Sequence, residues 1–144
     1  MASGLYGVTF LNALKNDLAL DLDDTTADRF KVMLVTSAYT PDFGAHDFKA
    51  DVTNEVVGTG YTAGGESLTS VTLTQAGGTI TFDAGNITWT SSTITARAAV
   101  LYDDLLTDDP LIAYIDLGAD KSSSNGDFVI TWDASGIFSI DLTP

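Results

Sequence analysis

The chain contains a single histidine, His46, and any Ser-His-Asp catalytic arrangement would have to use it. Phe43, Asp47 and Phe48 flank it, and the region lacks the G-x-S-x-G turn that holds a strained nucleophilic serine. Cysteine is absent, which excludes a thiolate nucleophile and a cysteine-ligated zinc site. We therefore interpret His46 as a turn or surface residue and expect no catalytic residues.

Neighbouring carboxylates are the second candidate for chemistry. Glycoside hydrolysis needs two carboxylates at a defined separation in a sugar-sized cleft. The segment 102–110 (YDDLLTDDP) instead reads as a short, solvated acidic turn that Pro110 closes. We expect no catalytic role for any of the pairs, which are Asp23/Asp24, Glu55/Glu66, Asp103/Asp104 and Asp108/Asp109.

The acidic segments 20–28 and 102–110 also offer the hard oxygen ligands that Ca²⁺ prefers. Neither has the glycine at the sixth position and the glutamate at the twelfth that define an EF-hand loop. We expect no cofactor and no metal ligand, and structural calcium in one of these segments is the alternative.

Trp89 and Trp132 both fall in strand-like runs and allow two interpretations. Exposed on a β-sandwich, they would stack on sugar rings and bind carbohydrate. The core is favoured, because Trp132 alternates with Phe128 and Ile130 on one strand face. Trp89 alternates with Ile87 in the same way.

Arg97 stands between Ala96 and Ala98 in the most apolar run of the chain. A buried charge is costly unless it is paired. Arg97 therefore either faces outward or forms an ion pair with an acidic loop, for which the candidates are Asp83, Asp103 and Asp116.

The charge balance of six Lys and Arg against 20 Asp and Glu gives a net charge of −14. Such a chain repels phosphate backbones and anionic membranes, so we expect neither nucleic acid nor membrane as a partner. The charge serves solubility or forms an acidic face that meets a basic partner. The N-terminus lacks the basic region of a signal peptide, which predicts synthesis in the cytoplasm without that export route.

Leucines at positions 11, 14, 18 and 22 follow helical spacing, which predicts a helix over residues 10–20 with its leucines packed inward. From Arg29 onward the period changes to two, and Gly/Asn turns separate short runs rich in Thr and Ile. Residues 43–54 have room for one helical turn. Further strands are expected at 67–75, 78–83, 86–90, 92–102, 111–117, 127–132 and 137–142.

These patterns predict a mainly β fold, an antiparallel β-sandwich or jelly roll of about eight strands with one short N-terminal helix. Residues 1–144 are expected to form one domain, with an N-terminal arm and helix over about residues 1–24. Within this arm, the apolar run 5–10 (LYGVTF) is a candidate edge strand or docking segment.

The segment 53–68 (TNEVVGTGYTAGGESL) places four glycines around Tyr61. Glycine reaches positive φ without steric cost, so such a cluster predicts a shaped loop. This segment, together with 31–42 (KVMLVTSAYTPD), 87–104 and 112–133, resembles a family of small virion structural proteins of tailed bacteriophages. The resemblance implies a jelly-roll-like fold of the kind assigned to head decoration or cement proteins.

The function that the resemblance implies is non-enzymatic: the protein would decorate the outer capsid surface and cement it by bridging neighbouring major capsid protein subunits. Its partners would be the major capsid protein and itself, as a homodimer or homotrimer. It would be made in the host cytoplasm and reside on the virion. The alternatives are a minor tail, head-fibre or glycan- or receptor-binding virion module. Candidate contact residues are Leu5, Tyr6, Val8 and Phe10 in the N-terminal segment and Tyr61 and Gly64 in the glycine-rich loop.

Overall fold

The computed structural model describes residues 2–144, and β-strands dominate this part of the chain. It contains ten strands, one α-helix and one 3-10 turn, and all paired strands are antiparallel. The predicted mainly β, antiparallel architecture with one N-terminal helix is confirmed, while the finer assignment to a jelly roll stays a prediction. The elements are β1 (Gly4–Leu5), α1 (Gly7–Leu14), β2 (Phe30–Val35), η1 (Lys49–Asp51), β3 (Glu66–Ser67), β4 (Thr72–Ala76), β5 (Thr79–Asp83), β6 (Ile87–Ser92), β7 (Thr95–Asp103), β8 (Leu111–Ser122), β9 (Gly126–Ile130) and β10 (Phe138–Asp141).

The larger layer is a five-stranded sheet in the order β1-β8-β7-β2-β3. At its centre β2 and β7 pair in continuous register, from Phe30 opposite Asp103 to Val35 opposite Ala98. Nearly all side chains of these two strands are buried, on both faces of the sheet. A strand with no face in water needs no alternation, which explains the unbroken apolar run of residues 98–102.

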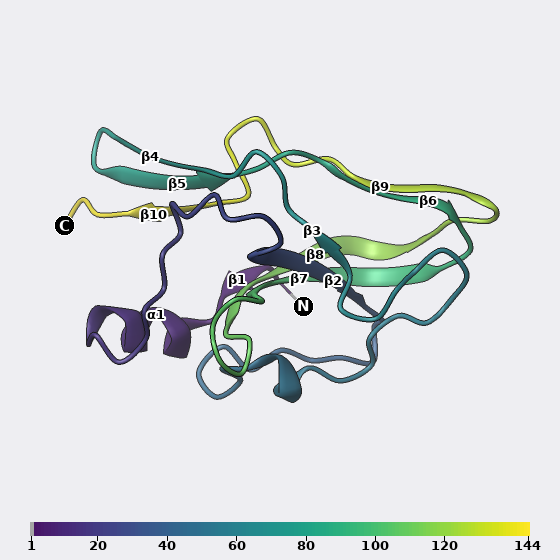
Figure 1. The fold of residues 1–144 in the computed structure, drawn as a ribbon, viewed down its shortest axis with the longest axis horizontal. Coiled ribbons are helices and arrows are strands. Elements are labelled where there is room, and N and C mark those ends of the chain that lie inside the picture. The colour runs from purple at the N-terminus through teal and green to yellow at the C-terminus, as the bar shows by residue number, and fades with distance from the viewer. Residues whose placement is uncertain (1) are drawn as a thin grey trace.

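The second layer consists of two sheet pieces built from the same two stretches of chain. One piece has the order β10-β5-β4, and the other pairs β6 with β9. Because β5 leads into β6 and β9 leads into β10, the two pieces form one long, bent ribbon over the five-stranded sheet (Figure 1). We call this layer the ribbon.

Each face of the five-stranded sheet carries its own hydrophobic core, and the side chains of β2 alternate between the two. The ribbon-side core contains Val32 and Leu34 and packs against the aromatic side chains of the ribbon. The loop-side core lies under the irregular segment 36–65 and the N-terminal residues. Its buried members are Tyr6, Met33, Val35, Tyr39, Ala98, Val100, Tyr102, Leu111 and Tyr114.

The helix α1 is shorter than predicted and presents a different face. It begins at Gly7 and ends at Leu14, whereas residues 10–20 were expected. Leu11 is 55% exposed and Leu14 is 88% exposed, so the prediction that the leucines pack inward is wrong. The helical spacing of the leucines continues to Leu18 and Leu22, but the helix itself ends at Leu14.

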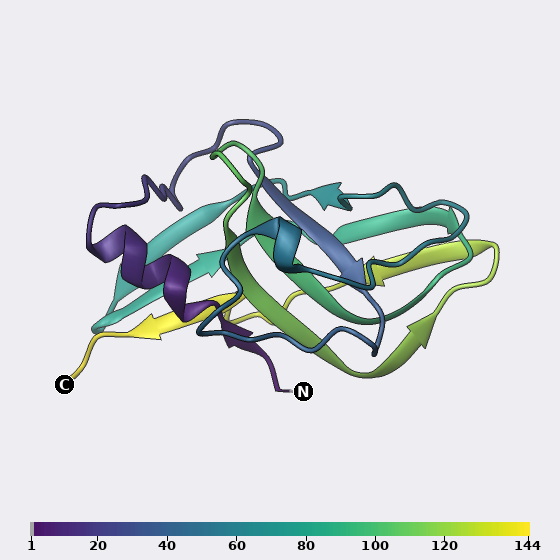
Figure 2. The same ribbon diagram turned by 90° about the horizontal axis from the view of Figure 1, so that it is seen from below.

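The side chains that attach α1 to the rest of the molecule are Thr9 and Phe10. Thr9 is buried, and the Phe10 ring meets the Phe138 ring edge-on, with 6.1 Å between centroids. Figure 2 shows α1 lying at the end of the molecule that also carries β4, β5 and β10. An aromatic contact to a strand, not a leucine stripe, therefore anchors this helix.

Two further expectations concern element boundaries. The strand expected at 67–75 is divided into β3 and β4 by an irregular stretch in which Ser70 has φ 54°. The strand expected at 111–117 runs on to Ser122 as β8, with a register shift against β7. The helical turn expected within residues 43–54 is confirmed as η1.

Candidate functional site

His46 lies in the segment that covers the loop-side core, and its hydrogen bonds are structural. Its Nδ1 atom is 3.0 Å from the Tyr39 hydroxyl and accepts the backbone N–H of Asp42 at 3.2 Å. The two rings also stack, with 5.8 Å between centroids. No serine hydroxyl in residues 2–144 forms a hydrogen bond with His46, so the contacts of a nucleophile–base pair are not assembled here.

The carboxylates of the 102–110 turn are neutralised by basic side chains. Asp103 is fully buried and accepts Nε and Nη2 of Arg29 at 3.0 and 2.8 Å. Asp104 pairs with Lys31 at 2.7 Å, and Asp109 pairs with Lys49 at 3.5 Å. A general acid or base must be free to exchange its proton with substrate, so these ion pairs favour a structural role.

Arg29 was not singled out from the sequence, yet it forms the central buried ion pair of the chain. Its Nη1 atom binds Asp24 at 2.5 Å, while its other nitrogens hold Asp103. The pKa of Asp24 is lowered to about 2 by its hydrogen bonds with Thr26 and Arg29. The arrangement ties the end of the 15–29 connection to the end of β7. Only the positions of Arg29 and Asp103 in three dimensions could reveal it, because they are far apart in the chain.

No group of three or more Asp, Glu or His side chains in residues 2–144 is arranged to hold a metal ion. In the same range no helix has the length and apolar character required to cross a membrane.

The two tryptophans are placed as their alternation predicted, although to different depths. Trp89 in β6 is 1% exposed and packs against the rings of Phe128 and Tyr61. Trp132 follows β9, is half-buried against the ribbon-side core and donates its indole N–H to the Gly85 carbonyl at 3.0 Å. Neither presents a free aromatic face of the kind that stacks on sugars, which favours the core interpretation.

Arg97 forms an ion pair, as one of the two interpretations predicted. Its Nε atom donates to Asp116 on the adjacent strand β8 at 3.0 Å, and Nη1 lies 3.8 Å from Asp120. The guanidinium of Arg97 holds the pKa of Asp116 below its usual value. Asp116 is therefore the partner among the three candidates, and Asp103 belongs to Arg29.

The glycine-rich loop is a shaped loop, as expected, and Tyr61 is its centre. The Tyr61 hydroxyl accepts the Leu34 N–H at 2.9 Å and donates to Glu55 Oε1 at 2.7 Å. The same carboxylate oxygen accepts the Gly64 N–H at 2.6 Å. The Tyr61 hydroxyl thus binds the backbone of β2 at Leu34, beyond the part of β2 that pairs with the short strand β3. Tyr61 and Gly64 are half-buried, so this loop offers a firm surface rather than a mobile arm.

The N-terminal contact candidates are only partly accessible. Leu5 in β1 pairs with Ala113 of β8, which confirms an edge strand at this position. Tyr6 is 0% exposed, so the expectation that its side chain contributes to a docking surface is wrong in this conformation. Val8 and Phe10 are half-buried on α1. This group lies at the β1 edge of the sheet and the glycine-rich loop lies at the β3 edge, so the structure does not bring the two groups together.

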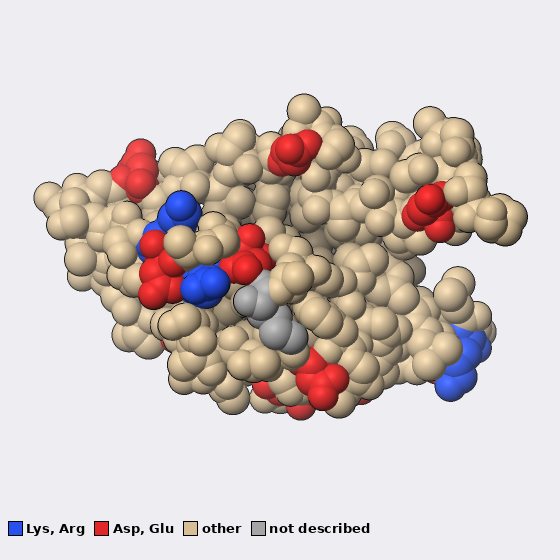
Figure 3. Space-filling model, turned by 180° about the vertical axis from the view of Figure 1, so that it is seen from behind, with Lys and Arg blue, Asp and Glu red and all other residues tan. Residues whose placement is uncertain are grey.

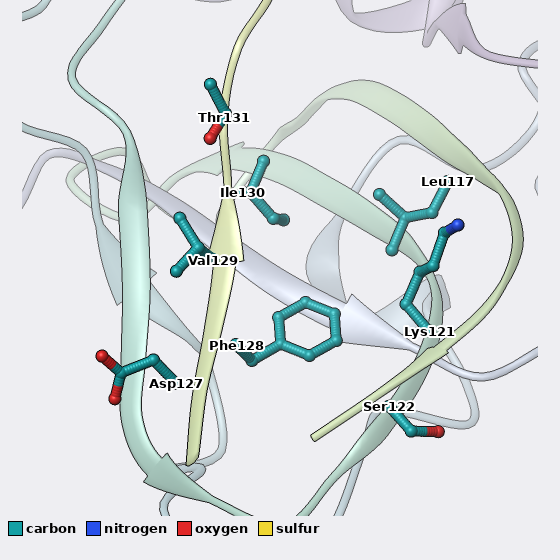
Figure 4. Close-up of a pocket in the computed structure, with 8 residues that line it drawn as sticks. All are labelled: Leu117, Lys121, Ser122, Asp127, Phe128, Val129, Ile130 and Thr131. Atoms are coloured by element: carbon teal, nitrogen blue, oxygen red, sulfur yellow. The ribbon is translucent and has the colours of Figure 1, made fainter.

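A groove between β8 and β9 is the feature that sequence reasoning missed. A short turn joins the two strands, but β8 pairs with β7 and β9 pairs with β6, so they belong to different layers. The space between them has a volume of about 310 Å³. Figure 4 shows Leu117, Phe128 and Ile130 pointing into it, with Lys121 at its rim.

The two strands present backbone edges as well as apolar side chains to this groove. In the sheet orders of residues 2–144, β9 has a neighbour on one side only, and the last residues of β8 extend past the short strand β1. An open strand edge offers unpaired N–H and C=O groups that an extended segment can bind. The sequence patterns made no prediction about which strands pair, so they held no signal for this groove.

The surface around these features is acidic. Five of the six Lys and Arg residues form ion pairs, and Lys121 is the one without an ion pair in the described part of the chain. On the face drawn in Figure 3, basic and acidic side chains gather on one side, another basic group lies at the opposite end, and separate carboxylates are spread over the rest. A partner that binds this protein by electrostatic attraction would therefore be basic.

Comparisons with known proteins identified no matching family model, no matching curated protein and no matching solved structure.

Proposed function

We propose that this protein is a non-enzymatic structural component of a tailed-phage virion that decorates the outer capsid surface and bridges neighbouring major capsid protein subunits. The resemblance of its glycine-rich loop and strand segments to small virion proteins suggests this class. The observation that carries the proposal is the β8–β9 groove, where two strand edges lie open beside the half-buried side chain of Leu117. Such a groove is suited to binding an extended protein segment.

The remaining architecture supports an associative role. The central strands β2 and β7 are buried on both faces, which gives a rigid body on which contact surfaces are held in place. Four of the candidate carboxylates form ion pairs with Arg29, Lys31 or Lys49, namely Asp24, Asp103, Asp104 and Asp109. Weak contacts of many copies with a shell add through multivalency, so shallow surfaces suffice for a decorating protein.

Binding of the purified protein to capsids that lack it, followed by cryo-electron microscopy, tests the proposal. We expect density on the outer shell between neighbouring capsid subunits. Density confined to the tail or to a fibre would replace capsid decoration with the minor-tail or head-fibre alternative.

A pair of variants tests the groove itself. Val129→Arg places a long, charged side chain on β9, where Val129 is 51% exposed and lines the groove. Leu142→Arg makes the same chemical change at a residue of 55% exposure outside the groove. We expect capsid occupancy to fall for Val129→Arg and to stay at the wild-type level for Leu142→Arg. Equal occupancy for the two variants would exclude the groove as the contact.

A further inference from the structure

Three side chains from distant parts of the chain form a hydrogen-bonded row in the loop-side core. The Tyr6 hydroxyl is 2.9 Å from the Tyr39 hydroxyl, and the Tyr39 hydroxyl is 3.0 Å from His46 Nδ1. Tyr6 lies between β1 and α1, so the row connects the only histidine to the N-terminal segment. Tyr6 and Tyr39 are 0% and 3% exposed, which keeps water from substituting for either partner.

The direction of the row is set by the backbone. The Asp42 N–H points at His46 Nδ1, and an amide nitrogen can only donate, so Nδ1 must carry a lone pair. The Tyr39 hydroxyl then donates to Nδ1, and the Tyr6 hydroxyl donates to the Tyr39 oxygen. With the neutral imidazole, the Tyr6 hydroxyl has its own acceptor, and the Tyr39 hydroxyl and the Asp42 N–H share the lone pair of Nδ1.

Protonation of His46 at Nδ1 reverses this direction. The new N–H donates to the Tyr39 oxygen, and the Tyr39 hydroxyl must turn toward Tyr6. The Tyr6 hydroxyl then has no acceptor, because Tyr39 is its single hydrogen-bond partner in residues 2–144. The Asp42 N–H loses its acceptor as well and faces another donor. Buried donors without acceptors are destabilising.

The charged groups around His46 determine whether a proton enters. Asp42, Asp47 and Asp51 lie on the same covering segment, and Tyr114 faces Tyr39 from β8. Backbone N–H groups of Phe48 and Asp47 hold the pKa of Asp51 below its usual value, so Asp51 stays negative in mild acid. Burial and the neighbouring Asp51 raise the pKa of Asp47.

We propose that His46 is a pH-sensitive lock on the N-terminal segment, closed when the imidazole is neutral and loosened when it is protonated. Loosening frees Tyr6, and with it β1 and α1, from the loop-side core. The pairing among β8, β7, β2 and β3 is unaffected, because these strand pairs do not involve the row. A comparison of pH 7.5 with pH 5.5 brackets the ordinary range of imidazole groups.

Amide hydrogen exchange of the full chain at these two pH values measures the lock. We expect the protection factors of residues 4–14, corrected for intrinsic rates, to fall about fivefold or more at the lower pH, which is the loss for one buried hydrogen bond. The amides of β7 serve as an internal reference and should keep their protection.

Two variants separate the lock from general acid loosening. His46→Asn retains a side-chain acceptor that does not titrate, so its N-terminal protection should be equal at both pH values. Tyr39→Phe breaks the row, so its N-terminal protection should be low already at pH 7.5 and fall no further. The proposal is overturned if the wild type shows no change, or if His46→Asn shows the same fall as the wild type.

Discussion

The two faces of the five-stranded sheet are buried to a similar extent, yet different forces hold their covers. On the ribbon side, Phe30, Phe82 and Trp89 pack with aliphatic side chains, and the cover is itself a paired sheet. On the loop side, the cover has little regular structure. Four buried tyrosines lie there, and the hydroxyls of Tyr6, Tyr39 and Tyr102 form hydrogen bonds with the cover or with each other.

This difference shows how an irregular segment can cover a sheet. A paired strand satisfies its own backbone groups, so apolar contact alone suffices to attach it. An irregular segment leaves some backbone groups without ladder partners, and side-chain hydroxyls and carboxylates must bind them. Hydrogen bonds are directional, so we expect the loop side to respond to small chemical changes and to pH, and the ribbon side to respond mainly to lost volume.

The largest effect is expected where the loop-side cover touches the sheet backbone. Gly65 has φ 78°, and a Cβ atom added there would overlap the carbonyl oxygen of Val32 in β2. Gly65→Ala should lower the free energy of unfolding by about 4 kcal/mol, the sum of overpacking and left-handed strain. Urea denaturation monitored by tryptophan fluorescence measures the change.

Gly77, in the turn between β4 and β5, is the matched control for Gly65. It has φ 59°, but no atom lies within 4 Å of an added Cβ. Gly77→Ala should therefore cost about 1 kcal/mol, from backbone conformation alone. Equal losses of stability in the two variants would mean that the loop-side cover can move away from β2 at Gly65 and is not held closely to it.

A cavity in the ribbon-side core should give the next largest effect. Leu101 in β7 is 0% exposed and has no polar contact to lose. Leu101→Ala should cost about 3 kcal/mol, from lost transfer free energy and the remaining cavity. The loss should be the same at pH 7.5 and pH 5.5 in thermal or urea unfolding, since no titrating group is involved. A loss of stability that differs between these pH values would contradict the expectation that the ribbon side responds mainly to lost volume and not to pH.

Tyr61→Phe removes one oxygen atom and leaves the ring in place. The backbone N–H of the buried Leu34 then loses its acceptor, and Glu55 loses a donor. We expect a loss of about 2 kcal/mol, typical of a buried donor left unsatisfied. The control is Tyr114→Phe, in the loop-side core, for which we expect a smaller loss. Native-state hydrogen exchange at Leu34 should show the difference directly.

The smallest effect is expected at the partly exposed ion pair between Arg97 and Asp116. The pKa of Asp116 is depressed in the folded state, so its contribution to stability is present above the unfolded carboxyl pKa and is lost as the pH falls through the folded value. Arg97→Met should lower the stability at pH 7 only slightly, and less than Tyr61→Phe does, because solvent screens the pair. Thermal unfolding at pH 7 and pH 2.5 should show this difference shrinking in acid; a difference that grows would contradict the assignment.

The ribbon-side core was largely predictable from the sequence, and the loop-side core was not. Period-two alternation identified Val32 and Trp89, because a strand face repeats every second residue. Nothing in the local pattern connects Tyr6 to Tyr39, or Arg29 to Asp103, since each pair forms only when the chain brings distant segments together. The leucines gave a wrong helix boundary for the opposite reason. Their local spacing is helical, but the helix α1 ends at Leu14.

A short turn joins β8 and β9, yet the two strands belong to different layers. In solution, the same separation of β8 from β9 has a consequence for the order of folding. β9 must find β6, and β1 must find β8, where Leu5 pairs with Ala113. Such long-range closures are slow compared with the formation of local hairpins. Because β1 precedes β8 in the chain, it has no partner strand until β8 has been made.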